Sequence, residues 1–176
     1  MKILAFAGSN SRNSINHALV SHVAELGKDM GIDIEVIRLT DFDTPMYGID
    51  LQNEHGFPEP TLKLAQKIDE ADKLIISLAE HNGSPTAFFK NQIDWLSRHN
   101  VNFLEGKQVL LLSTAPGPVG GANALAIIKT MLPFFSGEVV GEYSLGRYDD
   151  RFVDGKPTDD TVDAELKAKL QALIAS

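Results

Sequence analysis

The sequence contains no cysteine, which excludes disulfide bridges, zinc sites with cysteine ligands and thiol catalysis together. Its histidines show no metal-ligand spacing with one another or with acidic residues, so we expect no metal site. The G-x-S-x-G sequence that positions the nucleophile of many Ser-His-Asp hydrolases is also missing. The sequence therefore does not indicate a hydrolase of that kind.

Positive charge and long apolar segments are scarce as well. The chain carries 16 Lys and Arg against 24 Asp and Glu, a net charge of −8. Such a chain has little affinity for nucleic-acid phosphates or for an anionic membrane surface. No apolar segment is long enough to span a bilayer, and the first apolar run ends at Gly8, too early for a signal-peptide core. We expect a cytoplasmic protein with neither nucleic-acid nor membrane partners.

The residues that are present predict one α/β domain over 1–176, because apolar segments typical of strands alternate with segments of helical periodicity. We expect strands at about 3–7, 32–39, 74–79, 108–113 and 139–145. We expect helices at about 14–30, 61–71, 84–96, 124–132 and 158–174. In the third helix Ser84 is the expected cap and Pro85 the first helical residue. Residues 40–60 and 146–157 are expected to be loops.

The pattern of apolar and polar residues in the five strands predicts their order in the sheet. The first, third and fourth are continuous apolar runs, which is typical of central parallel strands, whereas the second and fifth are mixed with polar residues. The order 2-1-3-4-5 places the mixed strands at the edges. It gives a flavodoxin-like three-layer sandwich with helices on both faces, in which ligands bind at the carboxyl ends of the strands near the switch point between strands 1 and 3.

The loop between the first strand and the first helix has the composition of an anion site. Its polar side chains are Ser9, Asn10, Ser11, Arg12, Asn13, Ser14 and Asn16. The first N–H groups of a helix lack intrahelical partners and the helix dipole favours negative charge there, while serine hydroxyls and an arginine add donors and charge. We favour a phosphate as the ligand; the alternative is that Ser11, Asn13 or Ser14 merely caps the helix.

Two further polar, glycine-containing loops follow the third and fourth strands, at the same edge of the sheet. The backbone at Asn82-Gly83 can read the polar edge of a planar heterocycle, and the loop at 114–121 is lean enough at Pro116 and Gly117 for a flat ring to lie against it. A phosphate and a flat polar ring together indicate FMN. The glycine-rich signatures of dinucleotide-binding and P-loop proteins are missing.

Three motifs carry a resemblance to a known family. Gly8-Ser9 with Ser14 and Asn16, then Glu80-x-Asn82-Gly83-Ser84, then Lys90-Asn91-x-Ile93-Asp94-Trp95 are similar to the NADPH-dependent FMN reductase family over about residues 1–135. The resemblance implies a flavodoxin-like oxidoreductase that uses FMN and NADPH, reduces quinone-like or other small acceptors, and forms a homodimer or homotetramer. It implies that Ser9, Ser14 and Asn16 hold the phosphate, that residues 80–83 edge the isoalloxazine ring, and that the segment from Ser113 flanks it. The expected FMN-binding residues are Ser9, Asn10, Ser11, Arg12, Ser14, Ile15, Asn16, Glu80, His81, Asn82, Gly83, Ser113, Thr114 and Gly117; no side chain is expected to be catalytic.

The sequence departs from the family pattern at positions that bear on the site. Ser11 stands where the family usually has arginine, with Arg12 one residue later, and His81 stands where it usually has tyrosine. His81 either meets flavin and substrate or is a solvated turn residue. Lys90 and Arg98 either meet the 2′-phosphate of NADPH or are solvated helix positions. An FMN-binding electron carrier or regulatory module, without its own nicotinamide reaction, is the alternative function.

Overall fold

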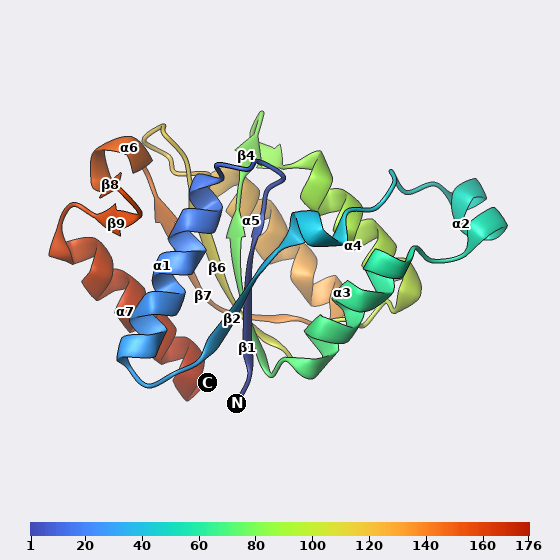
Figure 1. Cartoon of the computed structure of the whole chain (residues 1–176), viewed down its shortest axis with the longest axis horizontal. Coiled ribbons are helices and arrows are strands. Elements are labelled where there is room, and N and C mark those ends of the chain that lie inside the picture. Colours follow the sequence, from blue (N-terminus) through green and yellow to red (C-terminus); the bar gives the residue numbers. More distant parts are fainter.

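A computed structural model describes residues 1–176 as a parallel five-stranded sheet between two layers of helices (Figure 1). The strands are β1 (Ile3–Gly8), β2 (Ile34–Arg38), β3 (Lys73–Leu78), β6 (Gln108–Thr114) and β7 (Glu138–Leu145). Their order is β2-β1-β3-β6-β7, and every pair is parallel. Counted along this sheet, the predicted order 2-1-3-4-5 is confirmed, as are the two edge strands.

Each face of the sheet has its own apolar core. Helices α1 (Ile15–Asp29) and α7 (Asp160–Ala175) cover one face and bury residues such as Leu19 and Leu166 against Ile3, Ile75 and Leu110. Helices α3 (Glu59–Glu70), α4 (Ala87–His99) and α5 (Ala122–Met131) cover the other. The central strands are buried on both faces, which is why their apolar runs are continuous rather than alternating.

The predicted start of the third helix is wrong by two to three residues. Ser84 and Pro85 form β5 (Ser84–Pro85), which pairs with β4 (Glu80–His81) in a hairpin. Between them Asn82 and Gly83 both have positive φ, 53° and 74°, the two-residue turn that Asn-Gly favours. The cap of α4 is Thr86, whose hydroxyl accepts from the N–H of Phe89. The same hydroxyl donates to the carbonyl of Gly8, so a contact outside the helix helps fix where it begins.

The two expected loops contain short elements. Residues 40–60 include η1 (Leu39–Phe42) and α2 (Ile49–His55), and 146–157 include α6 (Tyr148–Arg151), β8 (Phe152–Val153) and β9 (Lys156–Pro157); η2 (Leu132–Phe135) follows α5. Helix α2 buries none of its residues and projects from the right of the molecule in Figure 1. A helix without a buried face has no apolar periodicity, which explains why the sequence pattern does not reveal it.

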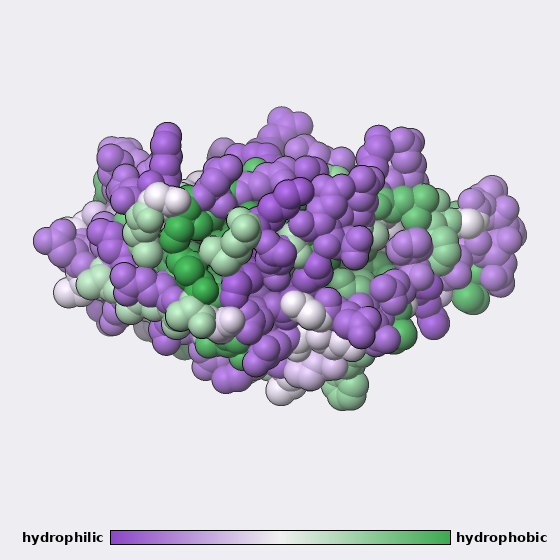
Figure 2. Space-filling model, turned by 90° about the horizontal axis from the view of Figure 1, so that it is seen from below, coloured by the Kyte–Doolittle hydropathy of each residue, from purple (hydrophilic) through white to green (hydrophobic).

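The two chain ends lie together at the edge where the strands begin, opposite the carboxyl edge (Figure 1). Figure 2 shows that lower face as mainly hydrophilic, with scattered apolar groups. It holds a hollow of about 230 Å³ whose charged lining includes the ion pair between Lys67 and Glu35. None of the helices combines the length and the apolar composition that a membrane crossing requires.

Candidate functional site

The loops that follow β1, β3 and β6 meet at the carboxyl edge of the sheet around a hollow of about 220 Å³. Several of the expected FMN-binding residues line it: Ser9, Ser11, Ser14, Ile15, Asn16, Glu80, His81 and Thr114. The others, Asn10, Arg12, Asn82, Gly83, Ser113 and Gly117, lie in the same loops or at the strand end that leads into one, but do not line this hollow. The hollow therefore brings together residues 105 positions apart, from Ser9 to Thr114.

The first loop presents hydroxyl and N–H donors without using them all. The Ser9 hydroxyl oxygen accepts from the N–H of Ser11 at 3.2 Å, which leaves its own hydrogen to donate. Ser14 caps α1 by accepting from the N–H of His17 at 3.1 Å, so the capping alternative is true of this residue. The N–H groups of Ile15 and Asn16, in the first turn, have no intrahelical partner. Together these donors suit a phosphate at the positive end of the helix dipole.

Positive charge beside this loop comes from Arg12 alone among its residues, and Arg12 is exposed. His17 follows the loop in α1 and is half-buried. Burial, followed by the positive charge of Arg38, lowers the pKa of the His17 imidazole below its ordinary value. The neutral form of His17 is therefore favoured at neutral pH, so His17 adds little positive charge to the anion site.

The side chain of Asn16 is directed into the protein. It is only 2% exposed, and its Nδ2 donates to the carbonyl of Thr114 at 3.0 Å. Its Oδ1 accepts from the N–H of Thr114 at 3.0 Å and from the hydroxyl of Ser77 at 2.8 Å. The resemblance assigns Asn16 to the phosphate, yet these bonds occupy its side chain elsewhere. What Asn16 offers a phosphate is its N–H.

The second loop is the β4–β5 hairpin, which stands above the carboxyl edge at the top of Figure 1. Its base is anchored by Glu80, whose carboxylate accepts from Nδ2 of Asn123 at 3.1 Å and from the N–H of Ala124 at 3.0 Å. Glu80 thus caps the start of α5 and holds the hairpin to it. The turn at Asn82 and Gly83 leaves backbone groups free to meet a ring, and His81 is exposed beside it.

The third loop packs through its backbone against the segment after β7. Thr114 donates through its hydroxyl to the carbonyl of Leu145 at 2.7 Å, and the carbonyl of Gly117 accepts from the N–H of Arg147 at 3.0 Å. A Cβ at Gly120 would lie 2.6 Å from the backbone nitrogen of Gly146, so this approach requires glycine. Ser113 is fully buried, and its hydroxyl has no hydrogen-bond partner.

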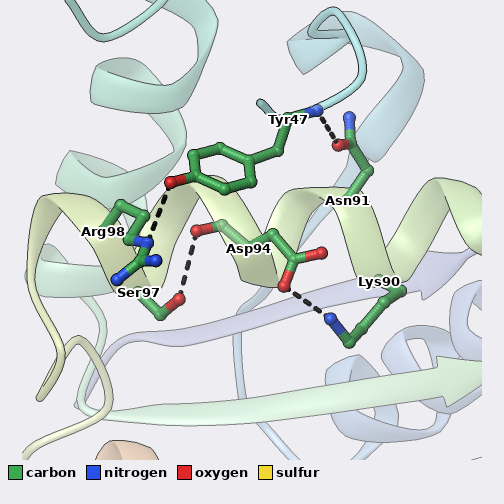
Figure 3. A network of polar contacts seen from close by, with 6 residues as sticks. All are labelled: Tyr47, Lys90, Asn91, Asp94, Ser97 and Arg98. Carbon is green, nitrogen blue, oxygen red and sulfur yellow. Dashed lines mark hydrogen bonds and ion pairs between the residues drawn. The ribbon is translucent and has the colours of Figure 1, made fainter. Parts of the chain in front are cut away.

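The polar residues of α4 serve a different contact (Figure 3). Lys90 pairs with Asp94 at 2.5 Å, and Nε of Arg98 donates to the hydroxyl of Tyr47 at 2.9 Å. Asn91 Oδ1 accepts from the N–H of Tyr47 at 2.7 Å, and the buried Trp95 donates to the carbonyl of Pro45 at 2.8 Å. This α4 network holds the chain between η1 and α2. Lys90 thus pairs with Asp94 on its own helix, and Arg98 contacts Tyr47 while remaining exposed.

Sequence reasoning missed the role of this network, although a signal was present. Asn91 and Trp95 are four residues apart, so they lie on one helical face. A polar amide and an indole N–H on a buried face each need a partner, which here is the backbone of residues 44–47. The motif around Lys90 thus positions a loop, and Trp95 belongs to the packed interior.

Comparisons with known proteins agree with this architecture. The sequence matches the profile of the NADPH-dependent FMN reductase family over residues 1–150. It is 32% identical over 143 residues to the quinone reductase of Escherichia coli, covering 81% of this chain and 74% of that protein. It is 28% identical over 183 residues to an NAD(P)H-dependent FMN reductase of Pseudomonas aeruginosa, covering 98% and 93%.

Among solved structures, the flavoenzyme NAD(P)H:(acceptor) oxidoreductase FerB of Paracoccus denitrificans superposes with a TM-score of 0.80 at 27% identity. That superposition covers 99% of this chain and 95% of the other. The profile match extends over most of the chain, and the quinone reductase of Escherichia coli exceeds 30% identity over most of both proteins. The chain therefore belongs to the NADPH-dependent FMN reductase family, a family of oxidoreductases.

Proposed function

We propose that the protein binds FMN in the carboxyl-edge hollow and transfers electrons from NADPH to a quinone-like or other small acceptor. The observation that carries this proposal is the convergence of three loops on one hollow at the switch point of the sheet. The first loop offers hydroxyl and N–H donors for a phosphate. The hairpin and the third loop offer a ring the backbone turn at Asn82-Gly83, next to the hollow, and the open space at Gly117. Family membership supports the same assignment.

The residues present fit FMN on three grounds. Ser9, Ser11 and Ser14 bring three hydroxyl groups to the hollow beside the start of α1, which suits a phosphate. The Asn82-Gly83 turn exposes backbone donors and acceptors, which suit the polar edge of the ring. The third loop is lean beside the hollow: a Cβ at Gly117 would touch nothing within 4 Å, so a flat ring has room there.

When bound, the flavin would supply the redox chemistry, accepting a hydride equivalent from the nicotinamide and passing electrons to the acceptor. The chain's own residues bind and orient. The first loop fixes the phosphate end, the hairpin fixes the ring edge, and the exposed His81 stands where an acceptor would approach. No side chain is required as an acid or base, so we assign none a catalytic role.

We further propose that the chain acts as a single domain in the cytoplasm and assembles as a homodimer or homotetramer, as the resemblance to the family suggests. NADPH rather than NADH as the donor, and a quinone-like compound as the acceptor, are proposals on the same basis. The name of the quinone reductase supports the acceptor, and the description of the family as NADPH-dependent supports the donor.

The decisive experiment is the visible absorption spectrum of the purified protein, with FMN titrated in if it arrives colourless. NADPH or NADH is then added anaerobically, followed by benzoquinone. We expect a bound-flavin spectrum that bleaches with NADPH and returns with the quinone. A bound flavin that neither nucleotide reduces would instead favour the electron carrier. A protein that binds no flavin would overturn the proposal.

A further inference from the structure

Asn16 joins three parts of the candidate site through one buried carboxamide. It lies in the first turn of α1, whose N–H groups face the first loop, and it is bonded to Ser77 near the end of β3 and to Thr114 at the end of β6. We propose that Asn16 is a positioning residue that couples the first loop (the phosphate loop) to the third loop (the ring loop), so that occupancy of either one favours binding at the other. This inference rests on the proposed function.

The geometry of the contact with Thr114 is that of a peptide group. The carboxamide donates to the carbonyl and accepts from the N–H of the same residue, both at 3.0 Å. A paired contact of this kind fixes orientation as well as distance, because displacing the carboxamide breaks both bonds. Thr114 is the last residue of β6, and the third loop begins directly after it. The position of α1 is thereby linked to the start of the ring loop.

The same bonds argue against a direct phosphate contact by this side chain. Its oxygen accepts twice and is an acceptor, so it cannot bind an anion; its nitrogen already donates once, and the side chain is 2% exposed. Breaking the contact would leave buried donors and acceptors unpaired on Ser77 and Thr114. Asn16 therefore contributes to the phosphate site through its N–H and to the ring site through Thr114.

A link between two sites has a measurable consequence. If phosphate at the first loop draws the start of α1 into a fixed position, Asn16 also fixes Thr114, and the ring binds a better-ordered loop. Equilibrium coupling is reciprocal, so a bound ring must favour phosphate by the same factor. The coupling is a property that general destabilisation of the chain would not selectively remove.

The test separates the two halves of the flavin by using riboflavin, which has the ring but no phosphate. Riboflavin is titrated by fluorescence quenching in the absence and in the presence of saturating inorganic phosphate. In the wild type we expect phosphate to tighten riboflavin binding at least about fivefold, the low end of typical coupling between sites. In Asn16→Ala we expect this factor to fall to about one, with riboflavin bound more weakly even without phosphate.

Ser9→Ala is the matched control because its hydroxyl lies in the phosphate loop and makes no bond to β3 or β6. It should require more phosphate for saturation yet keep the coupling factor once saturated. Circular dichroism establishes that each variant is folded. If Asn16→Ala does not fold, Ser77→Ala takes its place: it removes one of the three bonds and should lower the factor.

The outcomes divide clearly. If the wild type binds riboflavin but phosphate does not change that affinity, the inference is overturned while the proposed function stands. The same holds if the coupling factor is undiminished in folded Asn16→Ala, or in the Ser77→Ala variant that replaces it. A variant that loses phosphate affinity while binding riboflavin normally would make Asn16 a direct phosphate ligand, which also overturns it. Failure of the wild type to bind either FMN or riboflavin overturns the proposed function and this inference together.

Discussion

The hydroxyl of Ser14 accepts from the N–H of His17 and still carries a hydrogen of its own. One residue can therefore cap the start of a helix and also bind an anion. The two alternatives for Ser14, helix cap and phosphate ligand, do not exclude each other. Asn16 presents the reverse case. The position of Asn16 in the family motif predicts that its side chain binds phosphate. Its hydrogen-bond partners, Ser77 and Thr114, instead lie 61 and 98 residues away along the chain. Only the folded arrangement shows where it is directed.

At the same scale, Ser9→Ala should weaken FMN binding. A hydrogen bond to a charged group contributes about 1.5–3 kcal/mol, which corresponds to a roughly 10- to 150-fold higher Kd. Isothermal titration with FMN measures it. Riboflavin is the internal control, because it lacks the phosphate and its affinity should stay near the wild-type value. An unchanged Kd for FMN would remove Ser9 from the phosphate site.

His81→Tyr should alter the choice of acceptor more than the affinity for FMN. His81 is exposed beside the hairpin turn, while the turn itself is held by Asn82, Gly83 and the anchor at Glu80. An exposed aromatic side chain in its place adds apolar area where an acceptor would approach. The measurement is kcat/KM for a panel of small and bulky quinones, beside the Kd for FMN. Wild-type values throughout would make His81 a bystander.

Among the elements, the hairpin shows how two local signals compete. Ser84 and Pro85 match the start of a helix, yet Asn82-Gly83 matches a two-residue turn, and the turn prevails. Thr86 then caps α4 with support from the carbonyl of Gly8, at the end of β1. A cap whose partner lies 78 residues away cannot be read from local sequence. The residue pattern of the strands, in contrast, predicts the strand order correctly, because burial on both faces requires apolar residues along the whole of a central strand.

Gly83→Ala should destabilise the hairpin. Gly83 has φ +74°, a left-handed conformation that costs a residue with a Cβ about 1–2 kcal/mol. The free energy of unfolding in urea should fall by about that amount, and FMN should bind more weakly because the turn is displaced. Gly117→Ala is the matched control for stability, since its Cβ would touch nothing within 4 Å and its φ is not in the left-handed region. Equal stability of the two variants would contradict the assignment of strain.

The contact between Asp72, directly before β3, and Lys2, directly before β1, should stabilise the fold less in acid. The N–H of Lys2 donates to the Asp72 carboxylate at 2.6 Å and holds the pKa of that carboxyl below its ordinary value of 3.8. A carboxyl group whose pKa is lower in the folded than in the unfolded protein stabilises the fold at pH values above its unfolded pKa. This contribution is lost as the pH falls through its folded pKa. Stability of the wild type should therefore exceed that of Asp72→Asn at pH 6, and the difference should shrink below about pH 4.

Urea unfolding at a series of pH values measures this difference. Asp33→Asn, a change at an exposed carboxylate of the same edge, is the control. A difference between wild type and Asp72→Asn that stays constant down to pH 2 would show that the Lys2 contact does not set the acid response.

For the whole molecule, the sequence was sufficient for the sheet order and for the meeting of three loops at one edge, because both follow from strand burial and from the rule for parallel sheets. It was insufficient for α2, which buries nothing, and for the α4 network, whose partners are backbone groups of a distant segment. Patterns in sequence report burial well; they report the identity of a polar partner poorly, since any donor can satisfy any acceptor.

Because the proposed FMN site draws on loops that follow three strands, FMN should stabilise the entire fold. A ligand bound only by the native state at 100 times its Kd adds about 2.7 kcal/mol, and for a chain of this length that raises Tm by about 5–11 °C. Riboflavin at the same concentration should raise Tm less, because it leaves the first loop empty. Ser9→Ala should lower the FMN shift toward the riboflavin shift without reaching it, since it removes one of several donors to the phosphate. Differential scanning fluorimetry or calorimetry at fixed ligand concentration measures these three shifts in Tm.

Equal shifts by FMN and riboflavin in the wild type would show that the first loop does not hold the phosphate. No shift with either ligand would mean that the three loops meet without forming a flavin site.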